Sequence, residues 1–244
     1  MPSQYLENEG IQIAAGQMVR TSSIHKFGAV PAMSQNNSGT VWDINDTLYP
    51  WSAFDTAGVL AIPAVNASDN GHSVTVIGLD DNYDEVTEVF TVSSSTTTTG
   101  SQTFKRVFRA FCSGTGSTIN VGNINIQRGG TTVARITANK GQTLMSVYTV
   151  PRGFTGYLLK GTMTCQDGAD ATGDMFVRYD GSDIFRVGHS FEVSGDGGQY
   201  MYEFGVPIKI PSMSDIDVRA TVRSNNARLT AAFDMILYKD KGPL

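Results

Sequence analysis

The sequence has little of what most enzymes, membrane proteins and nucleic-acid-binding proteins depend on. Charged residues make up 17% of its 244 residues, against an average of about 25%. The net charge of −5 argues against a nucleic-acid surface, because such a surface needs a basic field. No apolar run approaches the ~20 residues that span a bilayer. The N-terminus lacks a basic region followed by an apolar run, so we expect no signal peptide.

Cysteine and histidine are also scarce. Cys112 and Cys165 have no metal-type spacing, so we expect two reduced and partly buried thiols. The histidines at 25, 72 and 189 form neither an HExxH nor an HxH pattern. Residues 188–192, GHSFE, resemble a nucleophile elbow, but Glu192 replaces the closing glycine and the α/β alternation is absent. We therefore expect no catalytic residue, no cofactor and no metal ligand.

Charged residues gather in several short groups. Aspartates and glutamates at turns would form and solvate those turns, although their oxygens could also bind calcium. A basic group is expected to form a solvated face, with a phosphate contact as the alternative. The acidic groups are Asp80, Asp81, Asp84, Glu85 and Glu88, then Asp167, Asp170 and Asp174, then Asp180 and Asp183; the basic group is Lys105, Arg106 and Arg109.

Among the residues that are present, three aromatic side chains fall within a short stretch, VWDINDTLYPW. They are Trp42, Tyr49 and Trp51. Pro50 prevents a helix from running through this stretch and biases Tyr49 toward extended backbone. We interpret the cluster as an aromatic plug at one end of a sheet. A sugar-stacking platform is the alternative, because aromatic faces with polar edges suit it.

Residues 74–92, VTVIGLDDNYDEVTEVFTV, have the clearest secondary-structure pattern. Apolar residues alternate on both sides of an acidic turn, and this is typical of a β-hairpin. Similar strand patterns recur at 8–12-residue spacing, which favours sandwiches or jelly rolls. Residues 93–101 are predicted to be a polar loop. The expected strands are 59–65, 103–111, 119–126, 131–136, 143–150, 154–165, 174–180, 184–193, 199–210, 215–222 and 228–238.

The sequence thus predicts an all-β fold of two antiparallel β-sandwich or jelly-roll-like domains, preceded by an extended N-terminal arm. Residues 1–40 have no sustained period of 3.6 or 2, so they are assigned to the arm, which orders only against a neighbour; simple terminal disorder is the alternative. Residues 41–150 form the first domain and residues 151–244 the second. The boundary is placed near the Pro151-Arg152-Gly153 sequence.

Several segments resemble a family of tailed-bacteriophage virion structural proteins of the podovirus and marine-phage type. They cover roughly the first 150 residues in order, and the remainder resembles the family only weakly. The segments are His25-Lys26-Phe27-Gly28, Val41-Trp42-Asp43, Tyr49-Pro50-Trp51, residues 74–92, FKRVFRAF (104–111), NINIQRGGTTVARI (123–136) and GQTLMSVYTVP (141–151).

The resemblance implies a non-enzymatic particle component that is assembled in the host bacterial cytoplasm and located in the virion. A head decoration or cement protein attached to the major capsid protein is favoured, because many copies convert weak contacts into strong retention. A tail or neck protein, including a host-glycan-binding tail-fibre module, is the alternative. The expected partners are the major capsid protein or neighbouring virion proteins. We also expect a homo-oligomer, with a trimer favoured, and no nucleic-acid or membrane partner.

Overall fold

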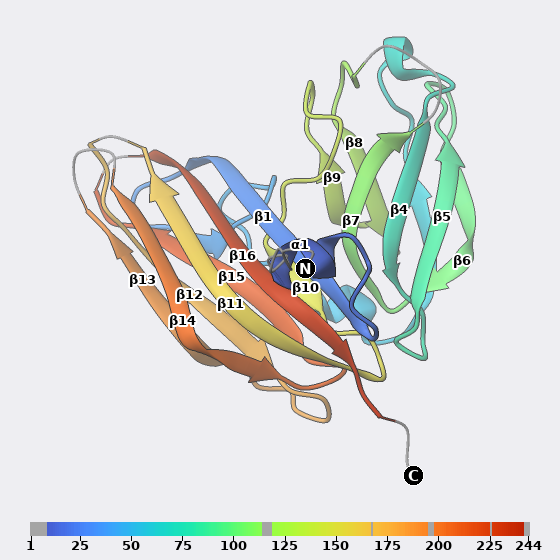
Figure 1. Ribbon diagram of the computed structural model, residues 1–244. Coiled ribbons are helices and arrows are strands. Elements are labelled where there is room, and N and C mark those ends of the chain that lie inside the picture. Colours follow the sequence, from blue (N-terminus) through green and yellow to red (C-terminus); the bar gives the residue numbers. More distant parts are fainter. Residues whose placement is uncertain (1–8, 114–118, 167, 195–197, 225, 242–244) are drawn as a thin grey trace, which may run out of the picture.

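The computed structural model describes residues 9–113, 119–166, 168–194, 198–224 and 226–241. Two β-sandwiches lie side by side and meet at a junction (Figure 1). A short helix α1 (Glu9–Ala14) and two 3-10 turns, η1 (Trp51–Phe54) and η2 (Ala67–Asp69), are the only helical elements of the described residues. No helix in those ranges is long and apolar enough to cross a membrane.

The first sandwich comes from the middle of the chain. One sheet has the order β6-β3-β8-β9 and the other the order β5-β4-β7. Their facing sides share one cluster of buried residues, with Leu60 and Ile126 from one sheet and Val76 and Phe90 from the other. The strands are β3 (Gly58–Ile62), β4 (Ser73–Leu79), β5 (Glu85–Thr91), β6 (Thr98–Phe104), β7 (Arg106–Ser113), β8 (Ile124–Arg128) and β9 (Thr131–Ile136).

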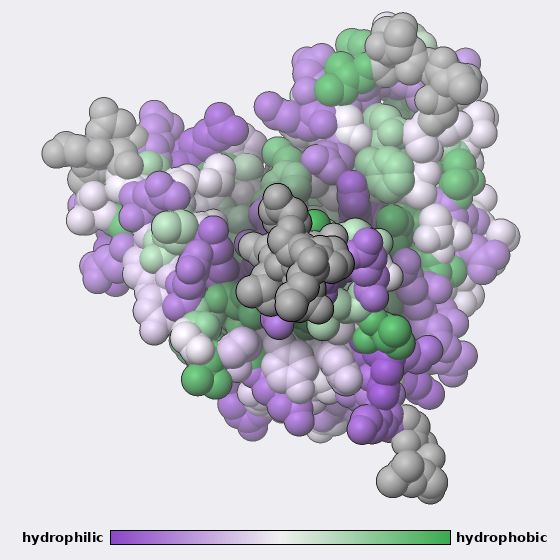
Figure 2. Space-filling model, viewed as in Figure 1, coloured by the Kyte–Doolittle hydropathy of each residue, from purple (hydrophilic) through white to green (hydrophobic). Residues whose placement is uncertain are grey.

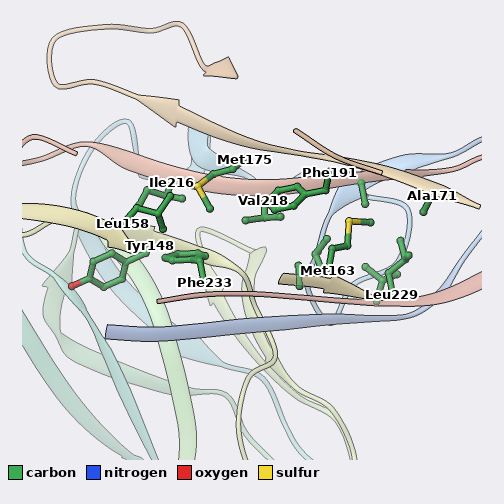
Figure 3. Close-up of a cluster of buried hydrophobic side chains, with 14 of the residues drawn as sticks. Tyr148, Leu158, Met163, Ala171, Met175, Phe191, Ile216, Val218, Leu229 and Phe233 are labelled. Atoms are coloured by element: carbon green, nitrogen blue, oxygen red, sulfur yellow. The ribbon is translucent and has the colours of Figure 1, made fainter. Parts of the chain in front are cut away.

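The second sandwich contains strands from both ends of the described chain. Its sheets have the orders β1-β16-β11-β14 and β10-β15-β12-β13, and β2 adds to β15. Figure 3 shows Met175, Phe191 and Val218 facing Met163 and Phe233 across the space between these sheets. The strands are β1 (Thr21–Met33), β2 (Ser38–Thr40), β10 (Val147–Thr149), β11 (Phe154–Cys165), β12 (Ala171–Arg178), β13 (Arg186–Val193), β14 (Gln199–Ile210), β15 (Asp215–Val222) and β16 (Ala227–Lys239).

The predicted all-β class is confirmed, and several strands match closely. The hairpin predicted at 74–92 is β4 and β5, paired from Ser73↔Thr91 to Leu79↔Glu85. Strands β14 and β15 have the predicted bounds 199–210 and 215–222. Other predictions were wrong in part. The predicted polar loop 93–101 contains the first half of β6, and the predicted strand 119–126 begins only at Ile124.

Residues 21–33 are not an arm, and this corrects the prediction for a large part of residues 1–40. They form β1, which pairs with β16 from Thr21↔Tyr238 to Val30↔Leu229. The inward positions of β1 include a lysine and a glycine, so its sequence has no apolar alternation for a periodicity argument to detect. Ser38–Thr40 is likewise strand β2. The part of the predicted arm at residues 1–8 lies outside the described residues.

Candidate functional site at the junction of the two sandwiches

The junction is organised around Asp215 on β15, whose side chain is buried. Arg106 of the first sandwich donates from Nε and Nη2 to the two carboxylate oxygens, at 2.8 and 3.0 Å. Arg178 on β12 donates from Nη2 at 2.6 Å, and the Thr149 hydroxyl donates at 2.6 Å. One carboxylate therefore joins strands of both sandwiches through charge-assisted hydrogen bonds.

The charge of Arg106 is maintained although the side chain is only 6% exposed. Burial by itself would lower the pKa of the guanidinium, but the hydrogen bonds and charge of Asp215 raise it above its ordinary value. The predicted solvated basic face is thus wrong for Arg106 and correct for Arg109, which is exposed. Arg106 lies on the inward side of β7, whereas Arg109 lies on the outward side.

A second buried carboxylate lies two residues along the same strand. Asp217 accepts from Trp51 Nε1 at 3.0 Å, from the Thr40 hydroxyl at 2.8 Å and from Arg219 Nε at 2.8 Å. Asp217 is 0% exposed, so the bonds from Trp51 and Thr40 are shielded from water, while the Arg219 side chain is partly exposed. β15 therefore holds the segments around Thr40 and Trp51 in place.

The aromatic stretch packs inside this junction. The rings of Trp42 and Tyr49 lie 5.3 Å apart and those of Tyr49 and Trp51 lie 4.7 Å apart, both edge to face. The Tyr49 hydroxyl donates to the Val107 carbonyl oxygen at 2.9 Å, and burial raises its pKa. The three rings are 2–8% exposed. They act as an aromatic plug, placed between two sandwiches, and their faces are not available to stack on a sugar.

Two further ionisable side chains are buried nearby, and neither forms an ion pair with an oppositely charged side chain of the described residues. Lys26 on β1 donates to the Phe108 carbonyl oxygen, and burial, assisted by the charge of Arg109, lowers its pKa to about 7. Burial raises the pKa of Asp43 to about 7, against an opposing effect of the backbone groups of Leu144 and Thr137. Sequence reasoning did not predict that either side chain is buried, because burial across a domain junction leaves no local signal.

A polar cavity of about 360 Å³ opens beside Asp215. Its cations are already engaged, because Lys105 Nζ donates to the Asp55 carbonyl oxygen at 2.7 Å and Arg178 pairs with Asp215. The predicted acidic turn residues Asp180 and Asp183 line its rim. Both acidic and basic side chains line this cavity, so its charge does not favour one class of ligand.

The other acidic groups lie only partly at turns: Asp80, Asp81 and Asp84 lie between β4 and β5, whereas Glu85 and Glu88 lie on β5 and Asp174 lies on β12. The Asp80 carboxylate accepts from the backbone N–H groups of Asn82 and Asp84 at 2.8 and 3.0 Å, which is an Asx-type turn. Asp174 accepts from the Ser190 hydroxyl at 2.6 Å. Asp167 lies outside the described residues. Within the described ranges, no group of three His, Cys, Asp or Glu side chains could hold a metal ion.

The nucleophile-like sequence at 188–192 lies on β13. His189 and Ser190 are adjacent in the strand, so their side chains point to opposite faces. Ser190 bonds to Asp174, whereas His189 Nε2 lies 3.1 Å from the Tyr200 hydroxyl. His189 is therefore not placed to act as a general base for the Ser190 hydroxyl. Cys112 and Cys165 are both free thiols, half-buried and buried, as the sequence predicted.

Comparisons with known proteins give no family assignment. No family model matches the chain, and no curated protein matches it. Among solved structures it is similar to the Cowpea mosaic virus top component, at 8% identity and a TM-score of 0.25, covering 78% of this chain and 89% of that one. A structure of infectious bursal disease virus strain Gt matches at 10% identity and a TM-score of 0.20, covering 91% and 78%. These TM-scores are too low to carry an argument about fold or function.

Proposed function

We propose that this protein is a non-enzymatic structural component of a tailed-phage virion, specifically a head decoration protein attached to the shell of major capsid protein. One observation carries the proposal. The segments that resemble phage virion proteins are scattered along the sequence, yet five of the seven contact one another at the junction. These five segments therefore form one structural unit, which supports treating the resemblance as a whole.

Hydrogen bonds join three of these segments directly. Lys26, in the segment 25–28, donates to the Phe108 carbonyl oxygen of the segment 104–111. Tyr49, in the segment 49–51, donates to Val107 of that same strand. The contacts fix where β1, the aromatic stretch and β7 lie relative to one another.

Two more segments meet beneath β1. Ser146 donates its N–H to the Val41 carbonyl oxygen at 3.0 Å, and Trp42 forms an isolated bridge with Met145. A Cβ atom at Gly28 would overlap the Val41 carbonyl and the Ser146 N–H. Glycine at position 28 thus allows the three segments to approach closely.

A decoration role suits a rigid molecule that repeats many times on one shell. Weak contacts multiply into strong retention when many copies bind equivalent positions. The proposed partners are the major capsid protein or neighbouring virion proteins, with self-association among the bound copies. The junction holds the two sandwiches in one orientation, so each copy would present the same surface.

Quantitative analysis of purified virions tests this proposal. The protein should band with mature particles in a density gradient, at hundreds of copies per particle. A count of roughly six to twenty would place it in the tail or neck, as expected from closed rings of subunits. Absence from intact virions, together with abundance in the infected lysate, would overturn the structural role.

The attachment segment can be tested separately. Residues 9–20 precede β1, and the exposed fractions of Ile11 and Val19 are 64% and 83%. We expect a variant lacking residues 2–20 to keep its β-rich circular dichroism spectrum and to lose binding in a particle-pelleting assay. If it pelleted as well as the full chain, the attachment surface would lie on the sandwiches.

A further inference from the structure

One side of the second sandwich exposes an unusual share of apolar side chains. Six of the fourteen large exposed hydrophobic residues of the described chain fall between positions 179 and 206. This stretch covers the β12–β13 turn, β13 and most of β14. Both strands are the last of their sheets (Figure 1). The six residues are Tyr179, Ile184, Val187, Met201, Tyr202 and Val206.

The exposed edge of β14 differs from the rest of its sheet. Strand β14 pairs with β11, but four of its residues, 204–207, stand opposite the single residue Leu159. The strand therefore bulges at this point, and Val206 within the bulge is 84% exposed. The viewed face of the molecule is mostly hydrophilic or neutral, with hydrophobic residues in scattered patches over both sandwiches (Figure 2).

We propose that β14 pairs antiparallel with β14 of a second copy of this chain, with Val206 on the two-fold axis. The inference rests on the self-association within the proposed function and names its surface and a two-fold symmetry, in place of the trimer that the sequence favoured. Exposed strand edges are templates for pairing with another chain. A two-fold axis brings the same edge of each copy together, so the edge must be complementary to itself.

The charged side chains of β14 make its edge complementary to itself. With Val206 opposite its own counterpart, Glu203 lies opposite Lys209 of the second copy, and Lys209 lies opposite the second copy's Glu203. Both side chains lie on the outer face of the sheet, as their partners Lys160 and Tyr157 on β11 indicate. Opposite charges directly across an antiparallel pair are stabilising.

The same register continues a row of charges across the sheet. His25, Asp234, Lys160 and Glu203 are successive cross-strand neighbours on β1, β16, β11 and β14. Their signs alternate when His25 is protonated. Lys209 of the second copy would extend the alternation by one strand.

Glycine and proline also fit this register. Pro207 cannot donate a backbone hydrogen bond and carries a ring, so it is tolerated only at suitable edge positions. The proposed register places it opposite Gly205 of the second copy. A Cβ atom at Gly205 would have no neighbour within 4 Å. Gly205 therefore leaves space for the Pro207 ring.

Light scattering and sedimentation of the full-length protein test the assembly. We expect a dimer at micromolar concentration. A chain that stays monomeric at about 100 μM would overturn the inference. A trimer would also overturn it, because an edge that pairs with itself closes after two subunits.

A charge exchange tests the register. We expect Glu203→Lys to weaken the dimer about tenfold, because it places two lysines opposite each other twice per dimer. Lys209→Glu should weaken it similarly. The double variant should return to within about threefold of the wild type. A double variant as weak as the single ones would overturn the pairing of 203 with 209.

Cross-linking tests the position of the axis. Val206→Cys should form a covalent dimer with a short bismaleimide reagent. The matched control is Val89→Cys, because Val89 is 61% exposed and lies on β5, which is also an edge strand. Equal cross-linking of both variants, or none at position 206, would overturn the proposed axis. Virion copy number is measured independently, so a failure here is distinguishable from a failure of the particle role.

Discussion

The two sandwiches are assembled from very different separations along the chain. In the first, every paired strand comes from residues 58–136, and hairpins such as β4–β5 and β8–β9 connect neighbours in sequence. In the second, β1 pairs with β16, so Thr21 lies opposite Tyr238. Local turns therefore specify much of the first sandwich. The second forms only when both ends of the described chain meet.

Deleting β1 is the change that we expect to destabilise the second sandwich most. A variant lacking residues 2–33 loses a strand of the second sandwich together with the buried side chains of Val30 and Met33. Each such loss costs roughly 2–5 kcal/mol, which is comparable with the whole stability of a typical domain. We expect an insoluble or molten protein by near-UV and far-UV circular dichroism.

The variant lacking residues 2–20 is the matched control for that deletion. It removes α1, which contains no buried residue, and ends before β1. Its unfolding midpoint should stay close to that of the full chain. A well-folded variant lacking residues 2–33 would show that β16 can serve as an edge strand unaided.

Breaking the junction should have the next largest effect. Asp215→Ala leaves the Arg106 and Arg178 guanidinium groups without their shared carboxylate. Removing one partner of a buried pair costs about 3–5 kcal/mol. Urea unfolding followed by tryptophan fluorescence reports this loss, because Trp51 lies at the junction.

The comparison for that variant is Asp234→Ala on the outer face of β16. Asp234 pairs there with His25, and both side chains are well exposed. An exposed ion pair contributes less than about 1 kcal/mol. Similar losses from the two substitutions would mean that the junction network contributes no more than a surface pair.

The two buried ionisable groups predict opposite pH dependences of the free energy of unfolding. Lys26 has its pKa lowered from 10.5 to about 7. Between those values the unfolded chain binds more protons, so stability should rise with pH. Asp43 has its pKa raised from 3.8 to about 7. In that range the native state binds more protons, so stability should fall as pH rises.

Single substitutions separate these two effects. Lys26→Met should remove the rise in stability above pH 7, and Asp43→Asn should remove the fall below it. Urea titrations at pH 5, 7 and 9 measure both. Unchanged pH profiles in both variants would show that the two groups are not buried in the folded protein in solution.

The smallest expected effect belongs to the turn of the first sandwich. Asp80→Ala removes the acceptor for two backbone N–H groups in the β4–β5 turn. The net cost of lost hydrogen bonds of this kind is about 1 kcal/mol. Asp81→Ala changes an exposed neighbour in the same turn and should leave the unfolding midpoint nearly unchanged. Equal effects would indicate a general charge effect rather than a specific turn.

Sequence reasoning located strands best where the local pattern was strong. Alternation and a turn signal placed β4 and β5, and β14 and β15 were predicted to the residue. It missed β1 because Lys26 and Gly28 occupy inward positions that only a tertiary partner explains. Lys26 reaches the Phe108 carbonyl oxygen, and Gly28 lets the backbone at Val41 pass close by.

At the candidate site, too, the sequence revealed local features but not those that depend on distant partners. The sequence identified Trp42, Tyr49, Trp51 and the basic group that includes Arg106, but it assigned that group to a solvated surface. Asp215 and Asp217 carried no signal, because isolated aspartates in a strand have many roles. Their importance depends on Arg106 and Trp51, which lie more than a hundred positions away.

The sequence by itself determined that this protein is built from antiparallel strands, and it placed the main turns. Periodicity and turn chemistry are local, so they can be read from neighbouring residues. Only the tertiary structure decided that residues 21–33 complete the second sandwich and that buried charges join the two sandwiches. Those features depend on burial and on distant partners, and both arise only once the chain has folded.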